Sequence, residues 1–325
     1  MSVRQQVISS ACLLVALISA HPAEAQSYPD RPIKMIVGYP AGGVVDATAR
    51  SFQRVVQEQL GQPILVENKP SEGGIVASTL NASATPDGYS LAFVASPTQT
   101  INPNLQKNFP FNPITGYTAI SIIASAPHVL LVNKDLPITS LRELIAYAKA
   151  NPGRLSFSSG GFGSGNHMTG EFLKRAAGID LLHVPYKGGG PASYIDVVNG
   201  TVSMIFQSLP TFAAVARNAQ VKALAVTSRE RNRALPTIPT MIEAGIPDFN
   251  VVVWFGVEGP PNLPKPIVAT LYAAVRKAVV DPSFSKRLID GGYNVIGSSP
   301  EEMATQVKAE NDLWSKIAKD MKIEN

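Results

Sequence analysis

The chain has 325 residues, 45% of them hydrophobic, and a formal net charge of +4. Its basic residues are scattered, without dense clusters or interleaved aromatic side chains, so the sequence does not support a role in binding nucleic acid or a membrane surface. A domain usually holds about 100–200 residues. The length therefore predicts two domains.

Residues 1–25 are expected to be a cleaved export signal. Arg4 precedes an apolar stretch from Ala11 to Ala20, and Ala23-Glu24-Ala25 fits the small-x-small pattern of a cleavage site. The stretch is shorter than the roughly 20 apolar residues that span a bilayer, so we expect cleavage after Ala25 and a periplasmic protein without direct membrane insertion. Lipid attachment at Cys12 is the alternative, but most of the apolar run follows Cys12, whereas a lipidated cysteine should end that run.

Apolar runs alternate with amphipathic segments along the rest of the chain. The run at 33–38 has no polar alternation, which predicts a strand buried on both faces. Similar runs predict further strands at 64–66, 91–95, 129–132, 155–158, 182–186, 204–207 and 223–227. Apolar residues at helical spacing or flanking signals predict helices at 45–60, 74–84, 167–177, 191–199 and 265–280. This order predicts a largely parallel sheet with helices on both faces.

Two capping boxes mark the starts of two more helices. Ser140 is followed by Glu143, and Ser299 is followed by Pro300 and Glu302. No proline-rich or glycine-rich linker separates two halves of the sequence. We therefore expect two domains joined by more than one crossing strand, with candidates at 124–132 and 249–257.

Glycine-rich turns lie between a predicted strand and a predicted helix at 40–43, 159–166 and 187–191. A helix N-terminus leaves backbone N–H groups unpaired, and glycine allows a ligand to approach the backbone closely. In open parallel sheets, ligands bind beyond the carboxyl ends of the strands. Turns of this kind facing one cleft predict a site for a small anion without a buried arginine. Tight turns without a ligand are the alternative.

The sequence lacks the motifs of common enzyme and cofactor sites. The turn at 159–166 does not match the G-x-G-x-x-G motif, Lys187 precedes its glycines instead of following them as in a phosphate-binding loop, and the turn contains no G-x-S-x-G elbow. The histidines beyond residue 25, which include His128, lack metal-ligand spacing to one another. We expect no cofactor, no metal and no catalytic site. His183 is expected to pack in a strand, whereas His167 either donates to a ligand or caps a helix.

Several segments resemble the Bug family, the extracytoplasmic substrate-binding receptors of tripartite tricarboxylate transporters. They are YPDRPIKMIVGYPAGG, GQPILVENKP, PDGYSL, INPNL, VPYKGGGPA, ALAVTS, PTIPTMIEAGIP and WFG, in the order of the family, and the similarity covers essentially the whole chain after residue 25. The resemblance implies a type II periplasmic-binding-protein fold, in which two α/β lobes are joined by crossing strands with a ligand cleft between them. On this basis we assign 26–126 and 249–325 to lobe 1, and 127–248 to lobe 2.

The resemblance also implies the position of a carboxylate site. In the family, backbone amides of the first turn wrap one carboxylate, and hydroxyl groups after the strand at 91–95 and loops of the other lobe add further contacts. The matching positions here are Tyr39, Pro40, Ala41, Gly42, Gly43, Val44, Val45, Asp46, Ser96, Thr98, Ser159, Gly160, Phe162, Ser164, His167, Gly188 and Gln207. Asp46 is expected to cap the first helix or to hold the loop, because a carboxylate repels an anion.

Two positions depart from the family pattern. Val44 stands where a small hydroxyl residue is common, and Gln207 stands where an aspartate is common. Loss of a hydroxyl group and of an acid favours a less polar ligand, or one without an amino group, and Phe162 offers an aromatic face. We therefore expect a mono- or dicarboxylate, with aromatic acids among the candidates, rather than citrate.

The predicted function is that of a monomeric receptor that captures a small carboxylate between two closing lobes and delivers it to membrane transporter subunits. A receptor that presents its ligand to a signalling sensor is an alternative that the sequence does not separate from uptake. An exported α/β enzyme is a further alternative. It would need a nucleophile with a base, or a metal set, and the sequence offers neither.

Overall fold

The computed structural model describes residues 28–186, 191–216 and 220–320, so the expected export signal at 1–25 lies outside the described residues. The described strands are β1 (Ile33–Val37), β2 (Ile64–Asn68), β3 (Ser90–Ala95), β4 (Thr118–Asn133), β5 (Ser156–Ser159), β6 (Leu182–Pro185), β7 (Met204–Ser208), β8 (Val221–Val226), β9 (Val252–Gly259) and β10 (Asn294–Val295). The α-helices are α2 (Val44–Leu60), α3 (Ile75–Ala82), α4 (Asn102–Leu105), α5 (Leu141–Ala150), α6 (Gly165–Ala177), α7 (Pro191–Val198), α8 (Leu209–Ala213), α9 (Lys265–Val280), α10 (Pro282–Asp290) and α11 (Pro300–Asp320). Two short helical turns are η1 (Glu72–Gly74) and η2 (Pro97–Ile101). None of the described helices combines the length and the apolar character that a bilayer-spanning helix needs.

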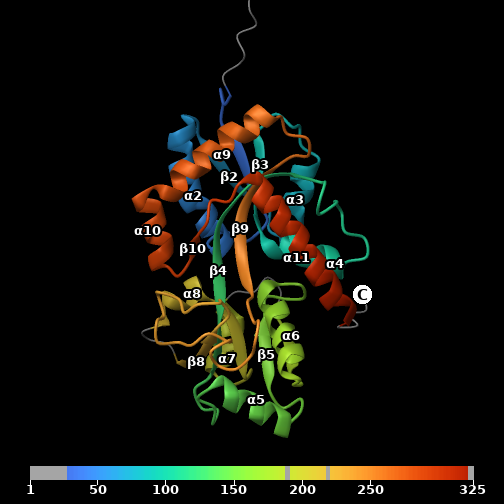
Figure 1. The fold of residues 1–325 in the computed structure, drawn as a ribbon, viewed down its shortest axis with the longest axis vertical. Coiled ribbons are helices and arrows are strands. Elements are labelled where there is room, and N and C mark those ends of the chain that lie inside the picture. The colour runs from blue at the N-terminus through green and yellow to red at the C-terminus, as the bar shows by residue number, and fades with distance from the viewer. Residues whose placement is uncertain (1–27, 187–190, 217–219, 321–325) are drawn as a thin grey trace, which may run out of the picture.

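The strands form one path in the order β2-β1-β3-β9-β4-β7-β5-β6, and β8 and β10 pair with β4. β2, β1 and β3 are parallel to one another, as are β6, β5 and β7. β9 and β4 lie between these two groups and run antiparallel to their neighbours. Figure 1 shows an elongated molecule with one α/β lobe around β1–β3 (lobe 1, upper) and another around β5–β7 (lobe 2, lower). The predicted largely parallel sheet is therefore confirmed for β1–β3 and for β5–β7, while β4, β8, β9 and β10 add antiparallel pairs.

β4 belongs to both lobes. It pairs with β9 from Thr118 to Pro127 and with β7 from His128 to Val132. The apolar residues at its end alternate between two cores of lobe 2. Leu130 and Val132 pack with α5 and α6, whereas Val129 and Leu131 pack with α7 and α8. The predicted strand at 129–132 is thus only the end of β4.

The second connection between the lobes passes through residues 249–253. Phe249 and Val251 pack in a core of lobe 2, whereas Val253 packs against the core of lobe 1. The N–H of Val251 also donates to the carbonyl of Thr227 at 3.1 Å. The two crossings predicted at 124–132 and 249–257 are therefore confirmed.

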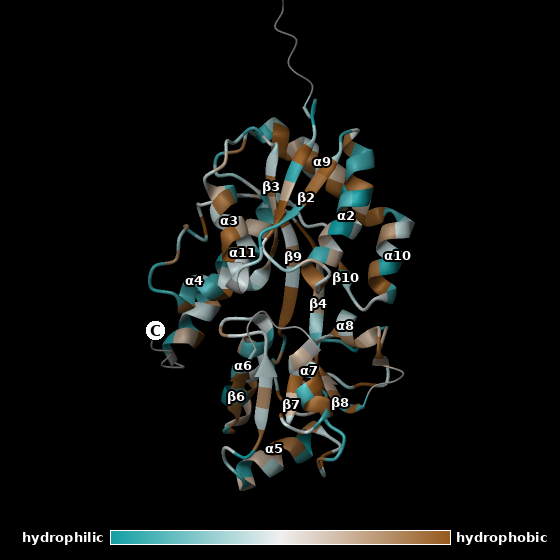
Figure 2. Ribbon diagram, turned by 180° about the vertical axis from the view of Figure 1, so that it is seen from behind, coloured by the Kyte–Doolittle hydropathy of each residue, from teal (hydrophilic) through white to brown (hydrophobic). Residues whose placement is uncertain are grey.

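Helices cover both faces of the sheet in lobe 1. α2, α9 and α10 pack on one face, and α11 packs on the other. Phe52 of α2 connects the sheet with α10 on the first of these faces. Its ring lies 6.0 Å from that of Phe93 in β3 and 6.4 Å from that of Phe284 in α10. Figure 2 shows hydrophobic and hydrophilic residues alternating along α2 and α10, as expected for helices with one buried face.

A buried polar cluster anchors η2 to the sheet of lobe 1. Gln99 of η2 donates through Nε2 to Glu258 of β9 at 2.7 Å and to the hydroxyl of Ser78 in α3 at 3.1 Å. Asn311 of α11 donates to the carbonyl of Gln99 at 2.9 Å. Burial raises the pKa of Glu258 to about 8, against the opposing effect of the hydrogen bonds from Ser78 and Gln99. The folded protein therefore keeps the Glu258 carboxyl group largely protonated at neutral pH.

This burial predicts a pH-dependent contribution to stability that the Glu258→Gln variant should lack. The unfolded chain releases the proton near the ordinary pKa of 4.5, and the folded protein releases it near 8. The free energy of unfolding of the wild type should therefore fall, relative to that of the variant, as the pH rises through this window, by up to about 1.4 kcal/mol per pH unit. Urea denaturation of both proteins at several pH values measures this difference. Parallel pH dependences would contradict the assignment.

Candidate functional site

The carboxyl ends of the parallel strands of both lobes point toward the junction between the lobes. β4 runs from lobe 1 into lobe 2, and β3 shares its direction because β9 is antiparallel to both. β7 runs opposite to β4, and β5 and β6 are parallel to β7. The loops after β1, β2 and β3 therefore face the loops after β5, β6 and β7. This is the edge at which α/β sheets bind ligands, and it contains the predicted site residues.

The loop after β1 ends at an uncapped helix N-terminus. α2 begins at Val44 with Gly43 as its N-cap, and no side chain of the described residues caps this end. The N–H groups of its first turn therefore have no partner within the helix. Val45, Ala49 and Phe52 fix the helix on the core of lobe 1, while the glycines at its start are exposed. Such an end attracts an anion through its N–H groups and the helix dipole.

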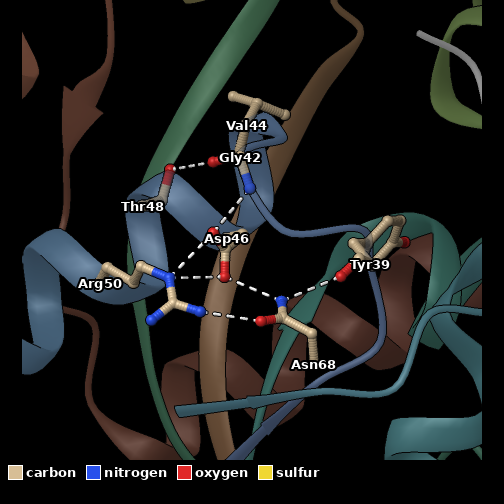
Figure 3. A network of polar contacts seen from close by, with 7 residues as sticks. All are labelled: Tyr39, Gly42, Val44, Asp46, Thr48, Arg50 and Asn68. Carbon is tan, nitrogen blue, oxygen red and sulfur yellow. Dashed lines mark hydrogen bonds and ion pairs between the residues drawn. The ribbon is translucent and has the colours of Figure 1, made fainter.

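Asp46 holds this loop in place, as expected. Its carboxylate accepts from the N–H of Gly42 at 2.9 Å, from Nδ2 of Asn68 at 2.8 Å and from Nε of Arg50 at 3.0 Å (Figure 3). Asn68 also donates to the carbonyl of Tyr39 at 3.1 Å. Burial alone would raise the pKa of Asp46, but the hydrogen bonds from Arg50, Gly42 and Asn68 and the charge of Arg50 outweigh it and lower the pKa. The N–H of Gly42 is therefore used within the protein.

The second glycine turn differs from the prediction, because its own side chains occupy its backbone amides. The N–H of Gly160 donates to Oδ1 of Asn166 at 3.2 Å, and that of Gly163 donates to Nδ1 of His167 at 3.1 Å. The N–H of Gly161 donates to the hydroxyl of Ser159 at 3.1 Å. Short polar side chains reach back to nearby amides in this way when the loop bends tightly. The expectation of unpaired amides at this turn is thus wrong for these three glycines.

The His167 side chain does not cap α6, and its donation to a ligand stays a prediction. The cap of α6 is Ser164, whose hydroxyl accepts from the N–H of His167 at 3.4 Å. The buried His167 ring instead accepts from the loop, and it lies 4.1 Å from the ring of His183. His183 packs on Phe157 at 4.9 Å, as expected, and contacts the hydroxyl of Ser159 at 2.6 Å. Burial is the main cause that lowers the pKa of His167 to about 3 and that of His183 to about 4, so both rings are neutral.

The remaining predicted site residues differ in their burial. Ser96 and Thr98 are buried, and Thr98 donates to the carbonyl of Gly73 at 2.6 Å, so its proton is not available to a ligand. Phe162 is 39% exposed. Gln207 is half-buried at the end of β7, and no hydrogen bond of its side chain to another described residue is found. Gly188 lies outside the described residues.

The sequence analysis missed the loop after β2. Gly73 and Gly74 there have φ of 62° and 75° and precede α3, whose N-cap Gly74 has no side chain to cap the helix, although the N–H of Val76 in its first turn donates to the hydroxyl of Ser71 at 3.1 Å. A Cβ atom on Gly74 would lie 2.5 Å from the ring of Tyr39, so the turn packs directly on the first loop. The signal was present: the sequence SEGGIV repeats the Gly-Gly and following apolar residues of PAGGVV. Within the described residues, no group of three or more His, Cys, Asp and Glu side chains is arranged to hold a metal ion.

The chain has two α/β lobes that are joined by two crossings, and the strand ends of the lobes face each other. This arrangement defines the class of periplasmic binding proteins, and solved structures support it. The periplasmic binding protein BugD matches with a TM-score of 0.82 and 33% identity, over 91% of this chain and 99% of that chain. A Rhodopseudomonas palustris protein solved with adipate matches with a TM-score of 0.83 and 31% identity, over 90% and 97% of the two chains. MatC from the same organism, solved with malate, matches with a TM-score of 0.81 and 31% identity, over 90% and 100%.

Residues 48–323 match the model of the tripartite tricarboxylate transporter family receptor, TctC, and the chain belongs to this family. BugT of Bordetella pertussis is 30% identical over 302 residues, which are 93% of this chain and 92% of BugT. A UPF0065 protein encoded in the tcbD-tcbE intergenic region of Pseudomonas sp. strain P51 is 34% identical over 97% of this chain and 93% of that protein. The family is one of transporter receptors, and the structural neighbour BugD is a periplasmic binding protein.

The network around Asp46 predicts that the Asp46→Ala variant loses stability. Its removal takes the charged acceptor from the N–H of Gly42 and from the half-buried amide of Asn68, and leaves Arg50 without its carboxylate partner, which should lower the free energy of unfolding by about 1–3 kcal/mol. Asp312→Ala is the control, because Asp312 is exposed and, among the described residues, forms an ion pair only with Lys308 across one helical turn, an interaction worth about 0.3–0.5 kcal/mol.

Urea denaturation near neutral pH measures both variants. The difference between them should shrink as the pH falls through the lowered pKa of Asp46, because the native interaction stabilises only the ionised form. Equal losses in the two variants at neutral pH would contradict a structural role for Asp46.

Proposed function

We propose that the protein is a periplasmic solute-binding receptor that captures a small carboxylate at the junction between its lobes. The main support is the uncapped N-terminus of α2, which lies exposed at the carboxyl end of β1. The one cationic side chain of the Asp46 network, Arg50, is already paired with Asp46 and Asn68. A ligand anion would therefore be held by backbone N–H groups and the helix dipole.

The energies of such contacts are sufficient for a transport receptor. An anion at a helix N-terminus gains up to about 2 kcal/mol when partly buried, and a hydrogen bond to a charged group gains about 1.5–3 kcal/mol. Several contacts of this kind offset the ordering costs and leave the roughly 8 kcal/mol of micromolar binding. Gln207 from lobe 2 has a half-buried amide at the facing strand end, and it supplies a further polar contact in this proposal.

We place the lobe boundaries at 26–126 and 249–325 for lobe 1 and at 127–248 for lobe 2. The change of β4 from β9 to β7 between Pro127 and His128 supports the first boundary. The second boundary lies next to the other crossing, where the core changes from that of lobe 2 at Val251 to that of lobe 1 at Val253, a few residues after the proposed position. The lobes rotate about these two crossings to enclose the ligand. The closed monomer then delivers the ligand to membrane subunits of a tripartite transporter, after export and cleavage following Ala25.

The expected ligand is a mono- or dicarboxylate with apolar or aromatic carbon, rather than citrate. Relatives have been solved with adipate and with malate, and in this chain Val44 packs beside the helix N-terminus and Phe162 presents an exposed ring. A thermal-shift panel of adipate, malate, benzoate and citrate tests this preference. At least one of the first three should raise the unfolding temperature. Stabilisation by citrate alone would reject the preference, and stabilisation by no carboxylate would count against the function itself.

Substitution of Gly43 tests the position of the site. Gly43 has an ordinary φ of −71°, and a Cβ atom there would approach only the carbonyl of Pro40, at 3.2 Å. Gly43→Val should therefore fold, while its methyl groups cover the N–H groups at the start of α2. We expect at least about tenfold weaker binding of the carboxylate found in the panel, equivalent to about 1.4 kcal/mol, measured by calorimetry.

Gln59→Val is the matched control, because Gln59 is exposed in the last turn of the same helix. It should bind like the wild type and have a similar unfolding temperature. Wild-type affinity in Gly43→Val would place the ligand elsewhere.

A further inference from the structure

Asn102, the first residue of α4, has its side-chain amide between two glycines that come from different lobes. A Cβ atom on Gly73, in the loop after β2, would lie 2.3 Å from Nδ2 of Asn102. A Cβ atom on Gly163, in the loop after β5 of lobe 2, would lie 2.4 Å from Oδ1 of the same amide. The two lobes therefore touch at this amide, and both neighbours must be glycine to allow the approach.

The amide of Asn102 has little freedom to move away. The side chain is 2% exposed, and Nδ2 donates to the carbonyl of Pro97 at 3.0 Å. Gly73 blocks one side and Gly163 blocks the other. Gly73 is itself held from lobe 1, because its carbonyl accepts from Thr98 at 2.6 Å and from Tyr39 at 3.2 Å. The contact thus connects the first loop to the second glycine turn through rigid groups.

An apolar cluster surrounds the contact and also spans both lobes. Ile101 and Leu105 of η2 and α4 pack with Met168 of α6 and with Trp314 and Ile317 of α11. α11 runs beside α4 in Figure 1, and Trp314 and Ile317 of its last turns share this cluster with Met168 of lobe 2, whereas its first turns lie on the sheet of lobe 1. We call Asn102, Gly163 and these five apolar residues the Asn102 seam.

We propose that the Asn102 seam sets the spacing between the loops of the two lobes when they close, with Asn102 as a positioning residue for ligand binding. This inference rests on the proposed function. Asn102 follows directly after η2, which Gln99 anchors to β9, and Gly163 belongs to the loop that precedes α6. A ligand that contacts both lobes can do so only at the spacing that the seam allows. Added volume in the seam should therefore weaken binding without contacting the ligand.

Gly163→Ala tests the spacing, with Gly178→Ala as its matched control. Gly163 has φ of 71° and Gly178, the cap at the end of α6, has φ of 61°, so both variants carry a similar backbone strain. A Cβ atom on Gly178 would meet no atom of the described residues within 4 Å. Small-angle X-ray scattering of the ligand-free proteins should give a larger radius of gyration for Gly163→Ala than for the control. Carboxylate binding should weaken by about 5- to 150-fold, the usual range of coupling between sites.

The double variant Gly163→Ala/Asn102→Ala should restore the wild-type radius and most of the affinity, because removal of the amide makes room for the new methyl group. A scattering profile of Gly163→Ala that superimposes on that of the control would overturn the proposal. This comparison needs no ligand. If the wild type binds no carboxylate in the panel, the proposed function fails, while the scattering result still decides whether the seam sets the spacing.

Asn102→Ala alone provides a second test in case Gly163→Ala does not fold. Loss of the amide should speed hydrogen exchange in the loop at 160–165 of lobe 2, and leave exchange in α5 of the same lobe unchanged. A role confined to lobe 1 would alter exchange only around residues 97–102. Unchanged exchange at 160–165 would therefore overturn the proposal as well.

Discussion

The direction of one strand determines where this protein places its loops. β4 is shared by both lobes, and its antiparallel pairing with β9 and with β7 sets opposite directions for the parallel groups on its two sides. Both sets of carboxyl ends must then face the same junction. The helix N-termini that follow β1, β2 and β5 meet there for this reason. Burial of β4 on both faces, by four separate apolar clusters, holds this arrangement in place.

Local signals in the sequence predicted most elements of the fold. The capping boxes formed as expected, since the hydroxyl of Ser140 accepts from the N–H of Glu143 at 3.2 Å and that of Ser299 accepts from the N–H of Glu302 at 3.1 Å. The first part of β4 was not predictable from periodicity, because Ser121 interrupts the apolar run. Ser121 is nevertheless buried, and its hydroxyl donates to the carbonyl of Ser298 at 2.7 Å. That partner lies far away in the sequence, and no local pattern indicates it.

The sequence predicted the loops that contain the candidate site residues better than it predicted which of their amides stay free. The pattern of two glycines before an apolar helix predicted the turn after β1. The same pattern occurs at Gly73 and would have predicted the turn after β2. Which amides stay free depends on side chains that fold back onto their own loop. Asn166 and His167 occupy amides of the second turn, and Asp46 occupies the amide of Gly42, whereas no described side chain caps the first turn of α2. Polar residues follow or flank both turns in the sequence, so the sequence alone does not show which amides stay free. The tertiary geometry determines it.

The position of β9 in the sheet also constrains the order in which the chain folds. β9 lies between β3 and β4, yet the whole of 134–251 separates it from β4 in sequence. Until β9 arrives, β3 and β4 each keep an unpaired edge, which is a template for wrong pairing. Lobe 2 has its strands close together in sequence and gains its contacts over shorter loops. We therefore expect lobe 2 to form early and the insertion of β9 to limit the rate at which the native state appears.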